Sequence, residues 1–282
     1  MTLYKVMRDK AEKDVKDMEI PENDITILEE IYTTDNNNIV KALWKDDVYA
    51  VKFIRRYANF QKEAKFMQKK IDHPNIVKYH GYFFSETALM WGIVMDYIDG
   101  EALIDYALRT PNKRIPEEEM LEYIPDMFSA IKCLHDNGIT HRDIKADNFI
   151  LTDCMVPILI DFDRITTNAV SKSTDGTVCY YAPEVSAGLL YDKSIDYWCF
   201  GMTVFVLTHG YFPFKCLPNK PPPEAAYKSL RKETKIISEK LLDLVCGLVT
   251  EPLLRYGEFE IIDAIRELTS ADTEGCKMIV SE

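Results

Sequence analysis

The sequence lacks the features that mark several protein classes. No CxxC pair occurs among its seven cysteines, which lie between Cys133 and Cys276. We therefore expect reduced thiols rather than a disulfide-stapled scaffold. The first twenty residues contain no unbroken apolar stretch of the signal-peptide kind. The longest strongly apolar run, 197–208, has about twelve residues, whereas a membrane-spanning helix needs about 20. These absences predict a cytoplasmic protein with no membrane span.

Basic residues are also in deficit. The chain has 34 Lys and Arg against 46 Asp and Glu, a formal net charge of −12. An acidic surface repels phosphate backbones, so we expect no nucleic-acid partner. Hydrophobic residues make up 47% of the 282 residues and charged residues 28%, which excludes disorder over most of the length. This length predicts one large domain or two lobes.

Hydrophobic patterning divides the chain into two parts. The first third looks strand-rich, because 48–54 and 93–98 are β-branched and aromatic runs. Between them, apolar residues at helical spacing from Phe60 to Ile71 predict a helix that ends before Asp72. Segment 32–38 (Tyr-Thr-Thr-Asp-Asn-Asn-Asn) is interpreted as a polar turn.

The rest of the chain looks helical. We expect an amphipathic helix from Met120 to Leu134, which Pro125 should kink and after which Gly138 should adopt a positive φ. Further helices are expected at 195–208 (fully buried), 243–249 and 261–268, and a proline cluster at 218–223 is interpreted as a loop. Strands followed by helices predict an α+β fold with a cleft and a join near Asp99 and Gly100.

The segment 141–148 (His-Arg-Asp-Ile-Lys-Ala-Asp-Asn) concentrates charge between apolar neighbours. Two apolar triplets follow, 149–151 and 158–160. They can pair as a hairpin in which the numbers of facing residues add up to about 309. In that register Asn148 lies beside Asp161.

An amide oxygen and a carboxylate in that position suit Mg²⁺, which prefers oxygen ligands and keeps waters that phosphates can replace. Asp143, on the loop leading in, could accept a hydroxyl proton, and Lys145 could meet a phosphate.

These motifs resemble those of the eukaryotic protein kinases. The segment 141–148, the Asp-Phe pair 161–162 and the Tyr-Ala-Pro-Glu of 181–184 occur in the family's order, and the resemblance runs from about Ile25 to about Thr269. It implies a bilobal protein-kinase-like fold with a small strand-rich N-lobe and a larger helical C-lobe. The implied divisions are an N-terminal extension (1–24), the N-lobe (25–98), the C-lobe (99–269) and a C-terminal tail (270–282).

The implied activity is that of a serine/threonine protein kinase, which transfers the γ-phosphoryl group of ATP to protein hydroxyls with Mg²⁺. Asp143 matches the catalytic aspartate, and Lys145 matches the residue that distinguishes Ser/Thr kinases from most tyrosine kinases. Asn148 and Asp161 match the metal ligands. The expected partners are protein substrates, and we allow for autophosphorylation.

Lys52 matches the strand lysine that holds the ATP phosphates, and Glu63 matches the helix glutamate that pairs with it. The sequence pattern supports a buried position for this pair, because Lys52 shares a predicted strand face with the apolar Val48, Ala50 and Ile54. Glu63 falls on the apolar stripe of its helix, where an unpaired carboxylate would be costly. The other implied nucleotide contacts are Ala50 and Phe149 (adenine), Met95 (gatekeeper), Asp96, Tyr97 and Ile98 (hinge), Glu101 (ribose), and Tyr32, Asn37 and Ile39 (phosphate-covering loop).

Other matches are structural or regulatory. Asp196 resembles the buried-helix aspartate that holds the catalytic-loop backbone. Glu184 and Arg255 resemble the ion pair at the end of the activation segment, and Thr177 resembles the threonine near Asp143. Because Arg142 precedes that aspartate, Ser173 is our first candidate for a regulatory phosphorylation site and Thr174 the second.

The sequence departs from the family at two places. Tyr32, Thr34 and Asn37 stand where the phosphate-covering loop carries glycine, although Asn37 tolerates positive φ. Asp163 stands where glycine follows Asp-Phe. We expect weaker ATP affinity or slower turnover. A pseudokinase scaffold is the first alternative and a small-molecule phosphotransferase the second. A viral, parasite or bacterial effector, acting in the host cytoplasm, fits the short chain as well as a host enzyme does.

Overall fold

A computed structural model describes residues 18–33, 37–215, 227, 229–231 and 236–275. The chain divides into two compact units. The first contains Met1–Asp99 together with Ile160–Ile165, and the second contains Gly100–Leu159 and Thr166–Glu282. The chain therefore leaves the second unit after Leu159 and returns to it at Thr166.

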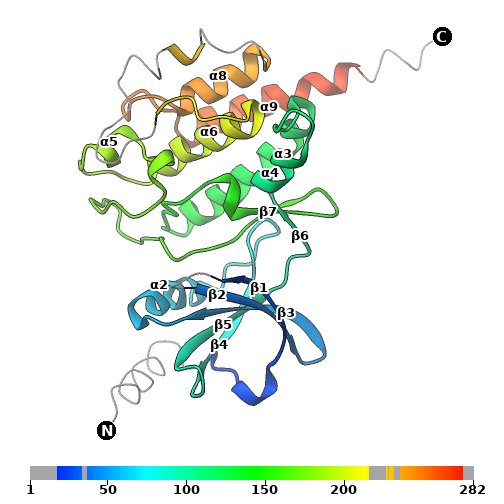
Figure 1. Cartoon of the computed structure of the whole chain (residues 1–282). Helices are drawn as coiled ribbons and strands as arrows, with labels where there is room; N and C mark the ends of the chain where they lie inside the picture. The colour runs from blue at the N-terminus through cyan, green and yellow to red at the C-terminus, as the bar shows by residue number, and fades with distance from the viewer. Residues whose placement is uncertain (1–17, 34–36, 216–226, 228, 232–235, 276–282) are drawn as a thin grey trace, which may run out of the picture. The chain divides into compact units, whose positions relative to one another are not determined.

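The first unit is built on an antiparallel sheet of five strands in the order β1-β2-β3-β5-β4, with helix α2 beside it (Figure 1). Its elements are η2 (Glu22–Asp24), β1 (Thr26–Thr33), β2 (Asn37–Trp44), β3 (Asp47–Ile54), α2 (Tyr57–Met67), β4 (Tyr79–Ser85) and β5 (Met90–Asp96). The two predicted strands are confirmed as β3 and β5, although β5 ends at Asp96, two residues early. The predicted helix is α2, which ends four residues before Ile71.

Strand β3 is buried on both faces. Val51 and Phe53 face a core cluster that also contains Ile20, Val40 and Phe83. The alternate residues Ala50, Lys52 and Ile54 are buried on the α2 side. Val48, which we expected on this apolar face, is 41% exposed because it lies near the open start of the strand.

The interpretation of 32–38 as a turn is wrong at both ends. Strand β1 continues through Thr33 and β2 begins at Asn37, with Tyr32 opposite Ile39 and Thr33 opposite Asn38. Cross-strand pairing of these polar residues overrides their turn propensity. Residues 34–36, and with them the expected site at Thr34, lie outside the described part of the chain.

The second unit is mostly helical and carries a three-stranded sheet, β6-β7-β8 (Figure 1). Sheet and helix-rich region together confirm the α+β class. Its elements are β6 (Gly100–Ala102), α3 (Leu103–Arg109), α4 (Glu117–Asp136), η3 (Ala146–Asn148), β7 (Phe149–Thr152), β8 (Pro157–Leu159), η4 (Val178–Tyr180), α5 (Pro183–Ser186), α6 (Ser194–His209), α8 (Glu239–Leu248) and α9 (Glu258–Gly275).

The four predicted helices of this part are confirmed as α4, α6, α8 and α9. Every residue of α6 from Ile195 to His209 is buried, as its apolar sequence predicted. Helix α4 continues through Pro125, and Gly138, just beyond its end, has φ 68°. The proline cluster at 218–223 lies outside the described residues.

The predicted hairpin exists, but its register differs by one residue. Phe149 lies opposite Leu159 and Leu151 opposite Pro157, so the residue numbers of facing residues add up to 308 rather than 309. The turn sets this register: the N–H of Met155 donates to the carbonyl of Thr152, and Met155 itself has φ 62°. The expected pairing of Asn148 with Asp161 as direct hairpin partners is therefore wrong.

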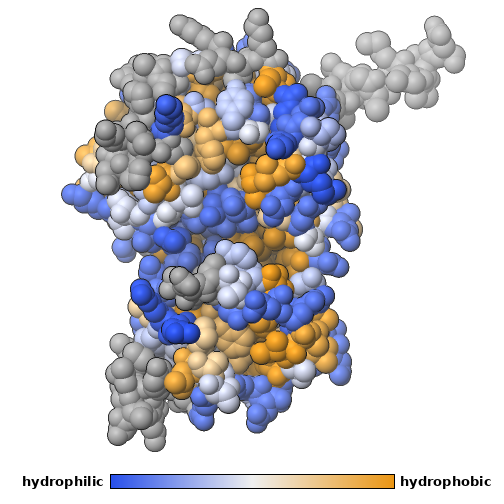
Figure 2. All heavy atoms as spheres, viewed as in Figure 1, coloured by the Kyte–Doolittle hydropathy of each residue, from blue (hydrophilic) through white to orange (hydrophobic). Residues whose placement is uncertain are grey.

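The surface carries scattered apolar side chains. On the face shown in Figure 2, apolar residues lie among hydrophilic ones in each unit. On β1, Ile27, Leu28, Ile31 and Tyr32 are exposed. None of the described helices combines the length and apolar character that a membrane crossing requires.

Gly92 of β5 provides a test of the first unit's packing. A Cβ atom there would lie 2.4 Å from the ring of Phe83, a buried member of the core cluster. We expect Gly92→Val to lower the free energy of unfolding by about 1–3 kcal/mol through overpacking. Denaturant titration would measure this. Gly257→Ala is the control, because its Cβ would meet only the end of the Glu260 side chain, at 3.1 Å. An equal loss in both variants would contradict the expectation.

Candidate functional site

A buried lysine is the centre of the first unit's site. The Nζ atom of Lys52 lies 2.6 Å from Oε1 of Glu63 and 2.6 Å from Oδ1 of Asp161. Lys52 is 3% exposed and Glu63 is fully buried. The three residues come from β3, α2 and the segment 160–165. The predicted pairing of Lys52 with Glu63 is thus present, and Asp161 joins it.

Electrostatics hold Lys52 in its charged form. Burial alone would lower the pKa of Lys52, but the carboxylates of Glu63 and Asp161 outweigh it and raise this pKa above its ordinary value. Tyr79 of β4 adds a hydrogen bond from its hydroxyl to Oε2 of Glu63 at 3.4 Å. Burial and the nearby carboxylates raise the pKa of Tyr79, so this hydroxyl stays protonated and remains a donor.

Phe162 fixes the segment that carries Asp161. Its ring stacks on Phe66 of α2 with centroids 4.0 Å apart and planes 8° apart, and Tyr79 meets it edge-on. Asp161 itself has φ 65°, an uncommon backbone conformation for a residue other than glycine. Packing of Phe162 therefore holds a strained backbone in the position from which Asp161 reaches Lys52.

The other predicted nucleotide contacts of the first unit lie on its strands. Ala50 and Met95 are opposite each other on β3 and β5. Asp96 accepts a hydrogen bond from His80, with 2.6 Å between Oδ1 and Nε2. Tyr97 follows the strand and lies under the ammonium of Lys41 at 4.4 Å. Ile39 faces Lys52 across β2 and β3, Tyr32 is exposed at the end of β1, and Asn37 begins β2.

The second unit gathers the residues of the charged loop. The hydroxyl of Thr177 donates to Oδ1 of Asp143 at 2.7 Å, and Nζ of Lys145 donates to the same hydroxyl oxygen at 3.1 Å. Lys145 and Asp143 also form an ion pair at 3.7 Å. The predicted proximity of Thr177 to these residues is therefore observed. The carboxylate of Asp143 has a cation on one side and a hydroxyl group on the other.

Asp196 of α6 holds the backbone of this loop. Its two carboxylate oxygens accept the N–H groups of His141 and Arg142, each at 2.8 Å, and Oδ2 also lies 2.8 Å from Nε2 of His135. Burial would raise the pKa of Asp196, but the hydrogen bonds and positive potential of His135 and His141 outweigh it and lower the pKa below its ordinary value. The carboxylate is therefore ionised. Its hydrogen bond from the N–H of Arg142 stabilises the uncommon backbone conformation of that residue, which has φ 70°.

Arg142 connects the loop to the segment that contains the two phosphorylation candidates. Its guanidinium contacts the hydroxyl of Ser173 and forms an ion pair with Asp175 at 3.1 Å. The hydroxyl of Tyr191 donates to the carbonyl of Ser173 at 2.7 Å. The carbonyl of Thr174 instead accepts from the hydroxyl of Tyr181. Ser173 is therefore the candidate closest to a cation.

Two further predictions concern charged side chains. Arg255 binds Glu184 through both guanidinium nitrogens at 2.6 and 3.1 Å, in a buried bidentate pair. Glu101, expected at a ribose, forms an ion pair with Arg109 of α3 instead of presenting a bare carboxylate. Phe149 is fully buried at the start of β7.

The predicted metal ligands have suitable donor chemistry. The amide nitrogen of Asn148 donates to the carbonyl of Asp143 at 2.8 Å, which leaves the amide oxygen to present lone pairs to a ligand. Asp161 supplies a carboxylate. Among the described residues, no three His, Cys, Asp or Glu side chains form a metal-binding group. A Mg²⁺ ion bound by either side chain would therefore need water or phosphate oxygens to complete its shell, as this ion commonly does.

Sequence reasoning missed several side chains of the site. Tyr79 and His80 lie on β4, which our patterning did not predict. Tyr191 lies in an irregular segment, where no periodicity marks it. Arg109 lies eight residues after Glu101, which precedes α3, so the i,i+3 and i,i+4 spacings within a helix do not mark this pair either.

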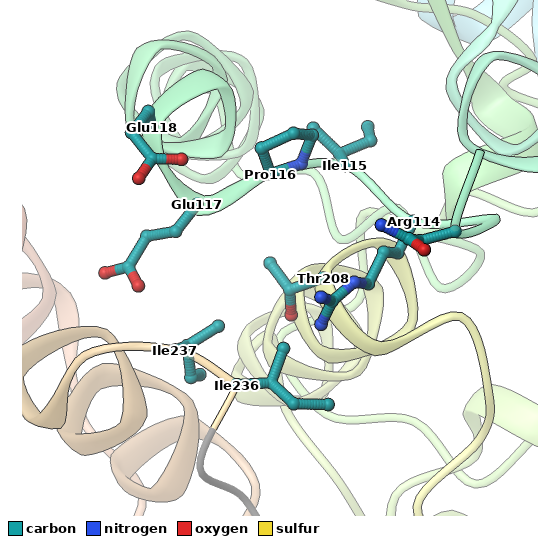
Figure 3. Close-up of a pocket in the computed structure, with 9 residues that line it drawn as sticks. Arg114, Ile115, Pro116, Glu117, Glu118, Thr208, Ile236 and Ile237 are labelled. Carbon is teal, nitrogen blue, oxygen red and sulfur yellow. The ribbon is translucent and has the colours of Figure 1, made fainter. Parts of the chain in front are cut away.

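A pocket of about 250 Å³ in the second unit lies apart from these residues (Figure 3). Glu117 on its wall accepts the N–H of Ser238 at 2.7 Å, and that serine caps α8. Its carboxylate thus joins α4 to α8. None of the residues predicted to act in function lines this pocket, which is formed by Asn112, Arg114, Ile115, Pro116, Glu117, Glu118, Thr208, Ile236 and Ile237.

Comparison with known proteins covers most of the chain. A family model described as "Protein kinase domain" matches residues 13–262. A probable serine/threonine-protein kinase of Dictyostelium discoideum is 31% identical over 222 residues, covering 74% of this chain and 48% of that protein. Serine/threonine-protein kinase Sgk1 of Homo sapiens is 32% identical over 178 residues (59% and 40%), and serine/threonine-protein kinase SAPK2 of Oryza sativa subsp. indica is 33% identical over 187 residues (63% and 54%). The chain spans about half the length of these relatives or less.

The lowered pKa of Asp196 predicts a specific dependence of stability on pH. A carboxyl whose folded pKa lies below its unfolded value of about 3.9 stabilises the fold above that value. This contribution is lost as the pH falls from about 5 through the folded pKa. We expect Asp196→Asn to lose about 2–3 kcal/mol at pH 7, the value of hydrogen bonds to a charged group. The deficit should shrink as the pH falls below 5.

Denaturant titrations from pH 3 to pH 7 would measure this deficit. Asp263→Asn, on the exposed surface of α9, is the control and should follow the wild type throughout. A deficit in Asp196→Asn that stays constant with pH would contradict the assignment of an ionised, stabilising carboxylate.

Proposed function

The chain belongs to the protein kinase domain family, and on that premise we propose that it is an active serine/threonine protein kinase. It would transfer the γ-phosphoryl group of ATP to Ser or Thr hydroxyls of protein substrates. We also propose the lobe boundaries 25–98 and 99–269, with 1–24 and 270–282 as flanking segments. The observation that carries the proposal is the buried junction of Lys52 with Glu63 and Asp161 at 2.6 Å.

Each unit contributes groups with a defined task. In the first, Lys52 offers a fixed positive charge to nucleotide phosphates, and Glu63 holds its ammonium in place. In the second, Asp143 would orient the substrate hydroxyl and accept its proton, while Lys145 would stabilise negative charge on the transferring group. Asn148 and Asp161 would hold Mg²⁺, which when bound neutralises charge on the phosphates. Catalysis of this type rests on positioning and electrostatics.

Support for Ser/Thr substrates comes from Lys145 and Thr177. Their side chains meet at Asp143, so the lysine is held beside the proposed proton acceptor. The named relatives that match the chain are described as serine/threonine kinases. Phosphoamino-acid analysis of the labelled product would test this specificity.

Phosphate transfer itself is tested with labelled Mg·ATP and a generic basic protein. We expect Asp143→Asn and Asp161→Asn to lower the initial rate at least about a hundredfold, because a proposed proton acceptor and a metal ligand are lost. Asp263→Asn should keep the wild-type rate. No transfer by wild type, or equal transfer by Asp161→Asn, would contradict the proposal and favour the pseudokinase alternative.

We further propose Ser173 as a regulatory phosphorylation site, with Thr174 second. The contact between Ser173 and Arg142 supports it, since a phosphate there would meet a guanidinium already in place. Phosphopeptide mapping of active protein should find the modification on Ser173, and Ser173→Ala should remove it while Thr174→Ala keeps it. Active protein without any modification from Thr166 to Thr177 would contradict this role.

A further inference from the structure

Five aromatic rings pack together where α2 meets the sheet of the first unit, and we call them the Trp91 cluster. Phe60 of α2 stacks on Trp91 of β5, with centroids 4.4 Å apart and planes 17° apart. Both side chains are buried, at 1% and 3% exposure. Three further rings surround the pair at centroid distances of 4.8 to 6.1 Å from Trp91, namely those of Tyr57, Tyr82 and Phe84.

The cluster shares a sheet face with Lys52. Trp91 lies opposite Ile54 of β3, and Ile93 lies opposite Lys52. Trp91 and Ile93 are two residues apart on β5, so their side chains point to the same face. The backbone rows that carry Trp91 and Lys52 are therefore two residues, or about 7 Å, apart along the strands.

Helix α2 carries both of its contact residues on one face. Phe60 and Glu63 are three residues apart, which places them on one face of the helix, one turn apart. Three residues advance about 4.5 Å along the helix axis. Contact of Phe60 with the Trp91 row thus aligns Glu63 with the Lys52 row. Rotating or sliding α2 would break both contacts together.

Packing of aromatic side chains holds α2 in place: besides the Phe60–Trp91 stack, Phe66 near the end of the helix stacks on Phe162 and meets Tyr79 of β4 edge-on. The helix has eleven residues and no side chain caps its N-terminus. Isolated helices of fewer than about 12–15 residues are marginal in water, so packing determines where this one lies. The Phe60–Trp91 stack is the closest ring contact between α2 and the strands.

We propose that Phe60 and Trp91 are positioning residues of the proposed kinase site: their ring stack, at the turn before Glu63, acts with the Phe66–Phe162 stack beyond it to set the rotation of α2 that brings Glu63 to Lys52. The catalytic consequence rests on the proposed function, whereas the geometric claim does not. Removing the stack should release Glu63 from Lys52 even though every charged group of the site remains.

Phe60→Leu removes the ring while keeping an apolar side chain. Phe53→Leu is the matched control, because Phe53 lies on the same strand as Lys52 but faces the opposite side of the sheet, where it meets the ring of Phe83 at 5.8 Å. Trp91→Leu and Trp91→Phe form a second pair, in which only the phenylalanine keeps a ring for Phe60. Glu63→Gln, which breaks the ion pair directly, is the reference.

The first readout is independent of phosphate transfer. Lys52 labelling by an amine-reactive acyl reagent is followed by mass spectrometry in full-length protein, at a temperature where circular dichroism finds each variant folded. We expect slow labelling in wild type, Phe53→Leu and Trp91→Phe. We expect Phe60→Leu and Trp91→Leu to approach the faster labelling of Glu63→Gln, because Lys52 loses a partner and its cover.

The second readout is kinetic. The kcat/KM for ATP should fall about tenfold to a hundredfold in Phe60→Leu and Trp91→Leu, the range expected when a catalytic group is misplaced by about 1 Å. Phe53→Leu should retain the wild-type value. Slow labelling of Phe60→Leu and Trp91→Leu beside fast labelling of Glu63→Gln would overturn the inference, and so would equal labelling of all variants. Absence of transfer by wild type would contradict only the proposed function, since the labelling comparison remains interpretable.

Discussion

A buried ammonium group imposes the main constraint on the first unit. Lys52 lies on a central strand and is almost completely removed from water. Left unpaired, such a charge would cost several kcal/mol. Two carboxylates neutralise this charge: Glu63 from α2, and Asp161 from a segment about a hundred residues further along the chain. This compensation explains why 160–165 packs with the first unit although the residues on either side belong to the second.

A buried anion has the corresponding role in the second unit. Asp196 lies within the buried helix α6, and it accepts hydrogen bonds from two backbone N–H groups and from Nε2 of His135. These bonds fix the backbone at His141 and Arg142, immediately before Asp143. The proposed catalytic residue Asp143 therefore lies on a loop whose backbone is held in place by the buried side chain of Asp196. In both units one buried charge holds neighbouring polar groups in place, and its loss would disturb more than its own contacts.

Local patterns predicted much of this arrangement. The β-branched run of β3, the apolar stripe of α4 and the continuous apolar surface of α6 each follow from sequence periodicity. Strand β1 escaped prediction because all its residues are exposed, so no alternation marks it. The one-residue error in the β7–β8 register has a similar origin, since Met155 adopts positive φ without a glycine to signal it. Tyr79 could not be placed, because its contact with Glu63 depends on tertiary packing.

The β1–β2 hairpin shows why the side chains around Lys52 matter to the proposed function. Pairing continues to Thr33 and Asn38, so backbone groups of these residues belong to the sheet ladder. Phosphate loops that bind through backbone N–H groups need glycine and unpaired donors. This chain has no glycine from 26 to 44. Under the proposed function, the negative charge of the nucleotide would then rest mainly on Lys52 and on metal bound by Asn148 and Asp161. A helix that holds Glu63 firmly is correspondingly more important here than where a glycine loop shares the task.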